Sequence, residues 1–231
     1  MTIVIQPEVF YIIVITLALC IFCVMCGQAI KKMDYLEQPK GLGHFAIMIV
    51  ESVDNMVASN TNQSKVDKLA PYIGCLAMYL LVCNLIGLFG LIQPTGNYSV
   101  TLALAIISVI LREKEALKTN GLKGYFKGLF EPFFPFVIPN LFGKIAPLIS
   151  MSLRLFGNIL SGTIIMTLVY AFCAWLSSLV PFIGAFNFVG PILAPILHAY
   201  FDVFSGCIQM FIFITLTQVY IGNELPVEEN K

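Results

Sequence analysis

The chain has 231 residues, of which 58% are hydrophobic and only 11% are charged, a composition that excludes an ordinary soluble domain. Its thirteen basic and thirteen acidic residues cancel, so its charge gives no reason to expect nucleic acid as a partner. Several apolar stretches reach the roughly 20 residues that cross a bilayer. The chain is therefore predicted to be an all-α, polytopic membrane protein with one membrane domain over residues 1–231.

Five membrane-crossing helices and one interfacial helix are expected from the lengths of the apolar runs. One run is short and is followed by acidic and polar residues, which favours a helix lying in the membrane interface. In chain order, the elements are a first span at 9–30, an interfacial helix at 41–58, a second span at 72–92, a third at 98–117, a fourth with its approach segment at 133–177, and a fifth at 186–221.

The last two spans are longer than a perpendicular crossing requires, so both are expected to tilt strongly. The regular helix of the fourth span is expected to begin near Pro147 and to break at 180–184, because prolines and a glycine stand there. A tight turn is expected at 93–97, and a basic loop containing glycine at 119–131.

Basic residues predict the orientation of the chain. Ten of the thirteen lie in two polar segments, 31–68 and 112–127, which follow the apolar parts of spans one and three, whereas the loops 93–97 and 178–185 carry none. The positive-inside rule then places the N-terminus outside and the C-terminus in the cytoplasm.

Four ionisable residues fall within the last two apolar stretches, namely Lys144, Arg154, His198 and Asp202. Asp202 is the only acidic residue within an apolar stretch. Arg154 cannot lose its proton, and a permanent charge at a helix centre costs roughly 3 kcal/mol in lipid. Such residues mark ion or substrate paths by default. Lys144 is instead expected to extend its amine to the inner interface.

The last helix carries a polar stripe. At about 100° per residue, His198, Asp202, Ser205 and Gln209 fall within roughly a 60° arc. If these groups only join helices by hydrogen bonds, with Arg154 paired to Asp202, the stripe is structural. A histidine and a carboxylate one turn apart favour a path for protons or other cations, because histidine titrates near neutral pH.

Polar residues on the fourth helix form two groups. Ser150, Arg154, Asn158 and Ser161 fall within roughly an 80° arc. The opposite side carries Ser152, Thr163, Thr167 and Tyr170.

No cofactor or metal is expected. Cys20, Cys23 and Cys26 have the spacing of metal ligands, but no histidine or carboxylate stands beside them on this apolar helix. They are therefore interpreted as small core residues, and the seven cysteines imply no disulfide framework.

The segment Ser152-Leu153-Arg154-Leu155-Phe156-Gly157-Asn158 resembles the signature of subunit a of the F-type ATP synthase. Further segments resemble other blocks of that family in the same order, so that the resemblance covers most of the chain. These segments are Asn84–Leu88, Thr101–Ala105 and Gln209–Phe213.

The resemblance implies a membrane stator beside a rotating ring of c subunits, with a b-subunit peripheral stalk and the remaining synthase subunits as further partners. Two half-channels would load and unload the ring carboxylates, with Arg154 between them. A fixed cation lowers the pKa of a nearby carboxylate and repels a passing cation. The residues expected to serve ion translocation are Arg154, Asn158, Thr163, His198, Asp202, Ser205 and Gln209.

The chain departs from the family pattern at several positions. Many members have a glutamate at the position of Thr163, and some have a histidine at the position of Asp202. The carboxylate that relays ions in other members is therefore expected on the last helix of this chain, at Asp202. Asn97 and Ser99 stand where aspartate and asparagine are frequent, so an outer-loop role does not carry over to them.

The sequence thus predicts an ion-translocating stator in a bacterial plasma membrane, not an enzyme by itself, with H⁺ as the expected coupling ion and Na⁺ as the alternative. A self-contained channel or transporter would need its own substrate site, such as broken helices in matched halves, and the sequence shows no such repeat. A scaffold without an ion path would tolerate the loss of the Arg154 charge.

Overall fold

The structure, a computed structural model, describes residues 7–31, 41–61, 69–130, 133–179 and 189–225, and within these ranges the regular elements are all helical. The α-helices are α1 (Pro7–Lys31), α2 (Leu42–Thr61), α3 (Leu69–Leu85), α4 (Tyr98–Phe130), α5 (Val137–Ser178), α6 (Val189–His198) and α7 (Ser205–Gly222). Between them lie the 3₁₀ turns η1 (Ile86–Phe89), η2 (Pro94–Gly96) and η3 (Phe134–Phe136), and the π-helical segment η4 (Ala199–Phe204).

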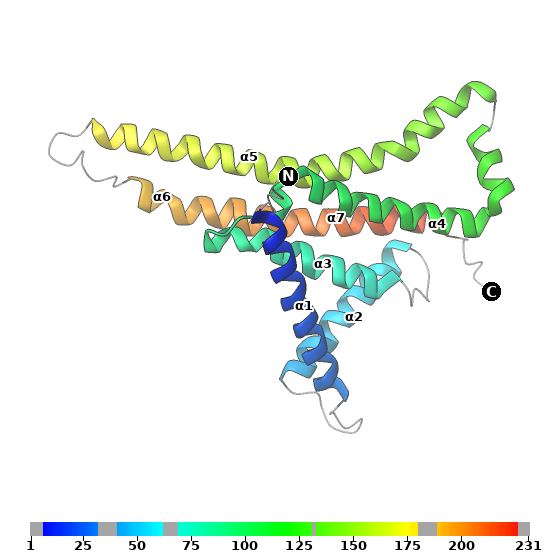
Figure 1. Cartoon of the computed structure of the whole chain (residues 1–231), viewed down its shortest axis with the longest axis horizontal. Helices are drawn as coiled ribbons and strands as arrows, with labels where there is room; N and C mark the ends of the chain where they lie inside the picture. The colour runs from blue at the N-terminus through cyan, green and yellow to red at the C-terminus, as the bar shows by residue number, and fades with distance from the viewer. Residues whose placement is uncertain (1–6, 32–40, 62–68, 131–132, 180–188, 226–231) are drawn as a thin grey trace, which may run out of the picture.

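Two long rods run side by side through the molecule (Figure 1). One is α5, and the other is the continuous run of α6, η4 and α7. α4 packs along the first half of α5, and α3 packs along α7. α1 crosses the direction of both rods at a steep angle (Figure 1).

The hydrophobic core lies where α2, α3, α4, α5 and α7 meet. Its fully buried side chains include Ile73 and Leu80 of α3, Leu155 of α5 and Phe213 of α7. Helices that bury apolar residues on one side only leave the other side to lipid or to partner subunits. Here α5 is buried along one narrow face and exposes large apolar side chains along the rest.

Four helical stretches of the described chain are long and apolar enough to cross a membrane. They are Glu8–Lys31, Leu69–Phe89, Phe134–Ser178 and Gly190–Gly222. The expected third span does not reach this standard, because α4 is apolar only over Tyr98–Leu111, and four charged residues follow. Fourteen residues of helix extend about 21 Å, less than the ~30 Å hydrocarbon core.

The prediction of a loop at 119–131 is wrong over most of that range. The chain stays helical to Phe130 and changes direction at Gly121, where φ is 67° and ψ is 167°. A residue with a side chain rarely adopts a positive φ, so glycine permits this bend.

α5 begins ten residues before the expected start at Pro147, which lies inside the helix. An internal proline removes one backbone hydrogen bond, but membrane helices tolerate this where neighbouring groups satisfy the freed carbonyl. The expected break at 180–184 and the first residues of the expected fifth span, 186–188, lie outside the described residues.

Candidate functional site

A cavity of about 480 Å³ lies between the amino-terminal end of α1, the turns η1 and η2, and the facing surfaces of α5, α6 and η4. About half of the residues that line it are polar. The polar lining residues of this polar cavity are Glu8, Asn84, Gln93, Asn158, Thr163, Thr167, Tyr170, His198 and Asp202.

Asn84, at the end of α3, holds one wall of the cavity together. Its side chain is 3% exposed, and its Nδ2 donates to the carbonyl of Gly206 at 3.0 Å. Its Oδ1 accepts from Thr95 Oγ1 at 3.3 Å, and its carbonyl accepts from Gln93 Nε2 at 2.9 Å. Asn84 therefore joins α3 to α7 and to the η2 turn. A Cβ at Gly206 would lie 3.1 Å from Asn84 Cβ, so the close approach of α7 requires a glycine.

His198 and Asp202 lie one turn apart on the wall formed by α6 and η4. Nδ1 of His198 is 2.6 Å from Oδ2 of Asp202, and Nε2 of His198 is 3.1 Å from the hydroxyl of Tyr170 on α5. These contacts form a chain of three ionisable groups across the cavity. Each group can both give and take a proton, so these three side chains can pass a proton between α5 and η4.

Asn158 and Ser205 join the two rods beside the cavity. Ser205 Oγ donates to Asn158 Oδ1 at 2.7 Å. Thr163 lines the cavity from α5, and its hydroxyl donates to the carbonyl of Ile159 at 2.9 Å. Asn158 and Thr163 border the same cavity, although helical geometry alone places them on opposite sides of the helix.

The predicted stripe on the last helix is divided in the structure. Only His198 and Asp202 line the polar cavity, whereas Ser205 contacts Asn158, and Gln209 is buried at 6% exposure outside the lining. Nε2 of Gln209 has no hydrogen-bond partner among the described residues. The arc of the stripe assumes the 100° per residue of a regular α-helix. Ala199–Phe204 instead forms a π-helix, whose wider turn rotates the residues that follow relative to His198.

Arg154 lies on the exposed side of α5, between the buried residues Met151 and Leu155. Its side chain makes no hydrogen bond or ion pair with any described residue, and it does not line the polar cavity. The structure therefore does not show the pair with Asp202 that a structural reading requires, because the carboxylate of Asp202 contacts His198 instead.

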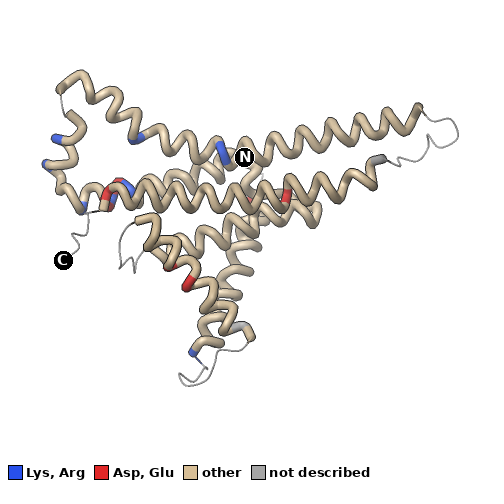
Figure 2. The backbone as a smooth tube through the Cα atoms, turned by 180° about the vertical axis from the view of Figure 1, so that it is seen from behind, with Lys and Arg blue, Asp and Glu red and all other residues tan. Residues whose placement is uncertain are grey.

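Large apolar side chains are exposed along both rods, and Arg154 lies among those of α5. We call these exposed apolar side chains the apolar face. Figure 2 shows neither basic nor acidic residues on the part of α5 that runs beside α6. The exposed apolar side chains of this apolar face include Leu153, Leu160, Ile164, Leu168, Phe172, Ile192, Ile196, Tyr200, Phe204 and Phe211.

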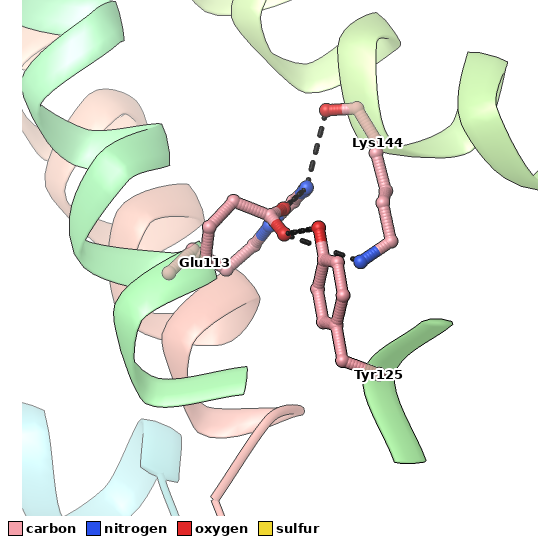
Figure 3. A network of polar contacts seen from close by, with 4 residues as sticks. Glu113, Tyr125 and Lys144 are labelled. Carbon is pink, nitrogen blue, oxygen red and sulfur yellow. Dashed lines mark hydrogen bonds and ion pairs between the residues drawn. The ribbon is translucent and has the colours of Figure 1, made fainter. Parts of the chain in front are cut away.

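A second polar cluster lies between the charged part of α4 and the first half of α5 (Figure 3). The carboxylate of Glu113 accepts hydrogen bonds from Arg112 and Tyr125, and it lies 3.2 Å from Nζ of Lys144. Arg112 Nη2 also donates to the carbonyl of Lys144 at 3.1 Å, and Lys144 Nζ lies 3.6 Å from the centre of the Tyr125 ring. We call these four residues the charge network.

Within the charge network the amine of Lys144 binds Glu113, a partner on α4 that the sequence did not indicate. The side chain of Arg112 is only 6% exposed, although it stands in the charged part of α4. Every charge of the network has a partner, which is the arrangement that a buried ion cluster needs to be stable.

Glu8 was missed by sequence reasoning, because the expected first span began one residue later. It lies in the first turn of α1 and reaches the polar cavity, which also holds Asp202. The signal was present in the sequence as an acidic residue at the start of an apolar helix, but only the fold brings that helix end to α5 and α6.

Comparisons with known proteins find relatives over nearly the whole chain. Residues 9–222 match the family described as ATP synthase A chain. The chain is 36% identical over 176 residues to "ATP synthase subunit a, sodium ion specific" of Propionigenium modestum, a match that covers 68% of this chain and 55% of that protein. It is 28% identical over 231 residues to ATP synthase subunit a of Staphylococcus aureus (strain JH9), covering 96% of this chain and 90% of that protein.

Proposed function

The chain belongs to the ATP synthase A chain family, and from that premise we propose that it is the ion-translocating stator of a rotary F-type ATP synthase. It is a multi-pass membrane protein and a non-catalytic subunit, so the nucleotide chemistry belongs to other subunits of the complex. The observation that carries the proposal is Arg154, an exposed arginine without a partner among the described residues, set in a face of large apolar side chains.

The apolar face is where the c-subunit ring binds. An unpaired guanidinium at a lipid-exposed position is costly, and a membrane carboxylate on a facing subunit would remove that cost by forming an ion pair. The exposed apolar side chains of α5, α6 and α7 offer the ring an apolar contact surface. The b-subunit peripheral stalk holds the chain against the ring from outside this face.

The polar cavity is one of the two half-channels. It holds the ionisable chain of Tyr170, His198 and Asp202 and the polar groups of Asn158 and Thr163, and it lies on the carboxy-terminal side of Arg154 along α5. Arg154 separates this half-channel from a second one, because a fixed cation repels a proton or sodium ion that would pass directly between them. Ser205 and Gln209 support the path from beside the cavity.

The orientation follows from the basic residues, with the N-terminus outside and the C-terminus in the cytoplasm of a bacterial cell. The polar cavity then opens to the outside, because it lies beside the η2 turn, which carries no basic residue. In this arrangement Tyr98–Leu111 completes a third crossing, α2 lies in the interface, and the steep angle between α1 and the rods leaves α5 and α7 strongly tilted.

H⁺ is the coupling ion that the cavity favours, because a tyrosine, a histidine and a carboxylate in one chain of contacts suit proton transfer. Na⁺ is the second candidate, because the relative in Propionigenium modestum is named as sodium ion specific. A self-contained channel or transporter lacks a comparable observation.

The proposal is tested in inverted membrane vesicles that carry the assembled complex. ATP-driven acidification is compared for wild type and Arg154→Ala, with the sodium concentration varied and with assembly measured by co-purification of the c ring. Loss of pumping with normal assembly supports the stator role, and pumping at the wild-type rate overturns it. Acidification of the wild type that disappears when sodium is added would instead favour Na⁺ as the coupling ion.

A further inference from the structure

Glu8 is a second carboxylate of the polar cavity, contributed by a helix that lies outside the two rods. It belongs to the first turn of α1, and α1 contacts the η2 turn that forms part of the cavity wall. The ionisable residues that line the cavity from all of its elements are Glu8 on α1, Tyr170 on α5, His198 on α6 and Asp202 on η4.

The carboxylate of Glu8 has one buried oxygen. Its Oε2 is buried and has no hydrogen-bond partner within the described residues, unlike the carboxylate of Asp202, which contacts His198. A buried carboxylate oxygen without a donor is unfavourable, and binding a proton or a sodium ion, or a water from the cavity, removes that cost.

A purely structural role is the simpler alternative. A carboxylate in the first turn of a helix interacts favourably with the helix dipole, typically by about 0.3–1 kcal/mol. This benefit requires no cavity, and an acidic side chain that served it alone could stay in water. Glu8 instead directs an oxygen into a buried position beside an open volume of about 480 Å³.

We propose that Glu8 is a cation-accepting group of this half-channel, which takes up a proton or a sodium ion at the cavity and passes it toward the Asp202 carboxylate. Glu8 gains the cation from water, releases it to Asp202, and returns to its charged form. The inference rests on the proposed stator function. It places the group that first accepts the ion on α1, and not on α5, which carries Arg154.

The test measures ATP synthesis by the intact complex in vesicles at a fixed membrane potential. The ion concentration on the side of the cavity is varied, with H⁺ and Na⁺ in separate series. The quantity of interest is the ion concentration that gives half of the maximal rate. We expect Glu8→Gln to raise that concentration by about tenfold in the series of the coupling ion, a change equal to ~1.4 kcal/mol in binding.

Two further variants separate ion binding from folding. Glu8→Asp keeps the charge on a shorter side chain and is expected to show a shift smaller than that of Glu8→Gln. Val9→Gln places the same amide one residue away, on a side chain that is 43% exposed and outside the cavity lining, and is expected to match wild type. If Glu8→Gln does not assemble, the half-saturating concentration of Glu8→Asp decides.

The inference is overturned if Glu8→Gln has the same half-saturating ion concentration as wild type in both the H⁺ and the Na⁺ series. If Glu8→Gln does not assemble, the same result for an assembled Glu8→Asp overturns it. A lower maximal rate without such a shift also overturns it, because a packing defect reduces the number of working complexes and not their ion affinity. Arg154→Ala is measured in parallel. If it abolishes synthesis while Glu8→Gln behaves as wild type, only the inference about Glu8 fails. If Arg154→Ala synthesises ATP normally, the proposed function fails as well.

Discussion

The charge network and the polar cavity both place ionisable groups against α5, but they treat those groups in opposite ways. In the charge network, Glu113 accepts hydrogen bonds from three side chains, and each charge has a partner. The polar cavity leaves open volume beside its groups, and one oxygen of Glu8 has no hydrogen-bond partner in the described chain. Arg154 lies between the two regions along α5, exposed and unpaired within the described residues.

This difference shows that the partners of an ionisable residue in a membrane protein, and not its presence alone, indicate whether its role is structural or in ion transport. Lys144 and Arg154 are both basic residues of α5, about 15 Å apart at 1.5 Å per residue. The paired one joins two helices, whereas the unpaired one remains available to a partner subunit. Complete pairing indicates structure, and incomplete pairing beside a cavity indicates a path for ions.

Among the residues of the polar cavity and the charge network, the largest effect is expected at Asp202. Asp202→Asn removes the carboxylate that contacts His198 and keeps the size of the side chain. Proton transfer by a positioned side chain contributes about 100-fold or more to a rate, so ATP-driven pumping per assembled complex should fall by that order. Acidification of inverted vesicles measures it, and Asp202→Glu, which keeps the charge, should retain part of the rate. Pumping by Asp202→Asn at the wild-type rate would mean that Asp202 is not the relay carboxylate.

Breaking the charge network should change stability and not ion transport. Glu113→Ala leaves the Arg112 guanidinium, 6% exposed, without its carboxylate. The loss of one partner of a buried pair costs 3–5 kcal/mol, and the partial exposure of Glu113 reduces our expectation to about 2 kcal/mol. The retention of the assembled complex after heating in mild detergent measures this loss.

The matched control for Glu113→Ala is Lys118→Ala. Lys118 pairs with Glu115 at 3.0 Å, but its side chain is 66% exposed, so its loss should cost less than about 1 kcal/mol. Two results would show that the charge network is not a purely structural region distinct from the polar cavity. One is an equal loss of assembled complex on heating for the two variants, and the other is a lower pumping rate per assembled complex for Glu113→Ala.

The wall of the cavity offers a third test. Gly206→Ala places a methyl group 3.1 Å from Asn84 Cβ and should push α7 away from α3, with a cost of about 1.5 kcal/mol from overpacking. The midpoint of thermal dissociation should decrease. Gly143→Ala on α5 meets nothing within 4 Å and should leave the midpoint unchanged or slightly higher. A Gly206→Ala complex as stable as wild type would show that this approach of α3 and α7 is not tight.

The smallest effect is expected at Tyr170. Tyr170→Phe removes the hydroxyl that lies 3.1 Å from His198 Nε2, and a hydrogen bond of this kind contributes about 1 kcal/mol. Pumping should fall by roughly fivefold, with assembly unchanged. Phe172→Tyr, on an exposed side chain of the same helix, adds a hydroxyl outside the cavity lining and provides the control. A Tyr170→Phe rate equal to that of wild type would place Tyr170 outside the ion path.

The helices were largely predictable from the sequence, because long apolar runs have few structures open to them in a bilayer. The expected loop at 119–131 failed since polar composition does not distinguish a loop from a helix outside the membrane, and the bend needs only Gly121. The early start of α5 was missed because Pro147 was treated as a helix boundary, although an internal proline is tolerated there.

The candidate site was predictable only in part. His198 and Asp202 were placed together from their spacing, and the π-helical segment then separated them from Gln209. Local composition does not specify that segment, which forms where α7 approaches Asn84. Glu8 and the charge network depend on contacts between residues far apart in the chain, such as Glu113 with Lys144, and helical periodicity carries no information on these.

The most direct test of the account compares Arg154→Gln with Lys144→Gln in the same inverted vesicles, with ATP-driven pumping divided by the amount of assembled complex. Both changes remove one positive charge from α5, but only Lys144 is paired within the described chain. If the Arg154 charge separates two half-channels, Arg154→Gln assembles normally and does not pump, while Lys144→Gln assembles less well and pumps at the wild-type rate per complex. Normal pumping by Arg154→Gln would show that the unpaired arginine has no part in moving ions.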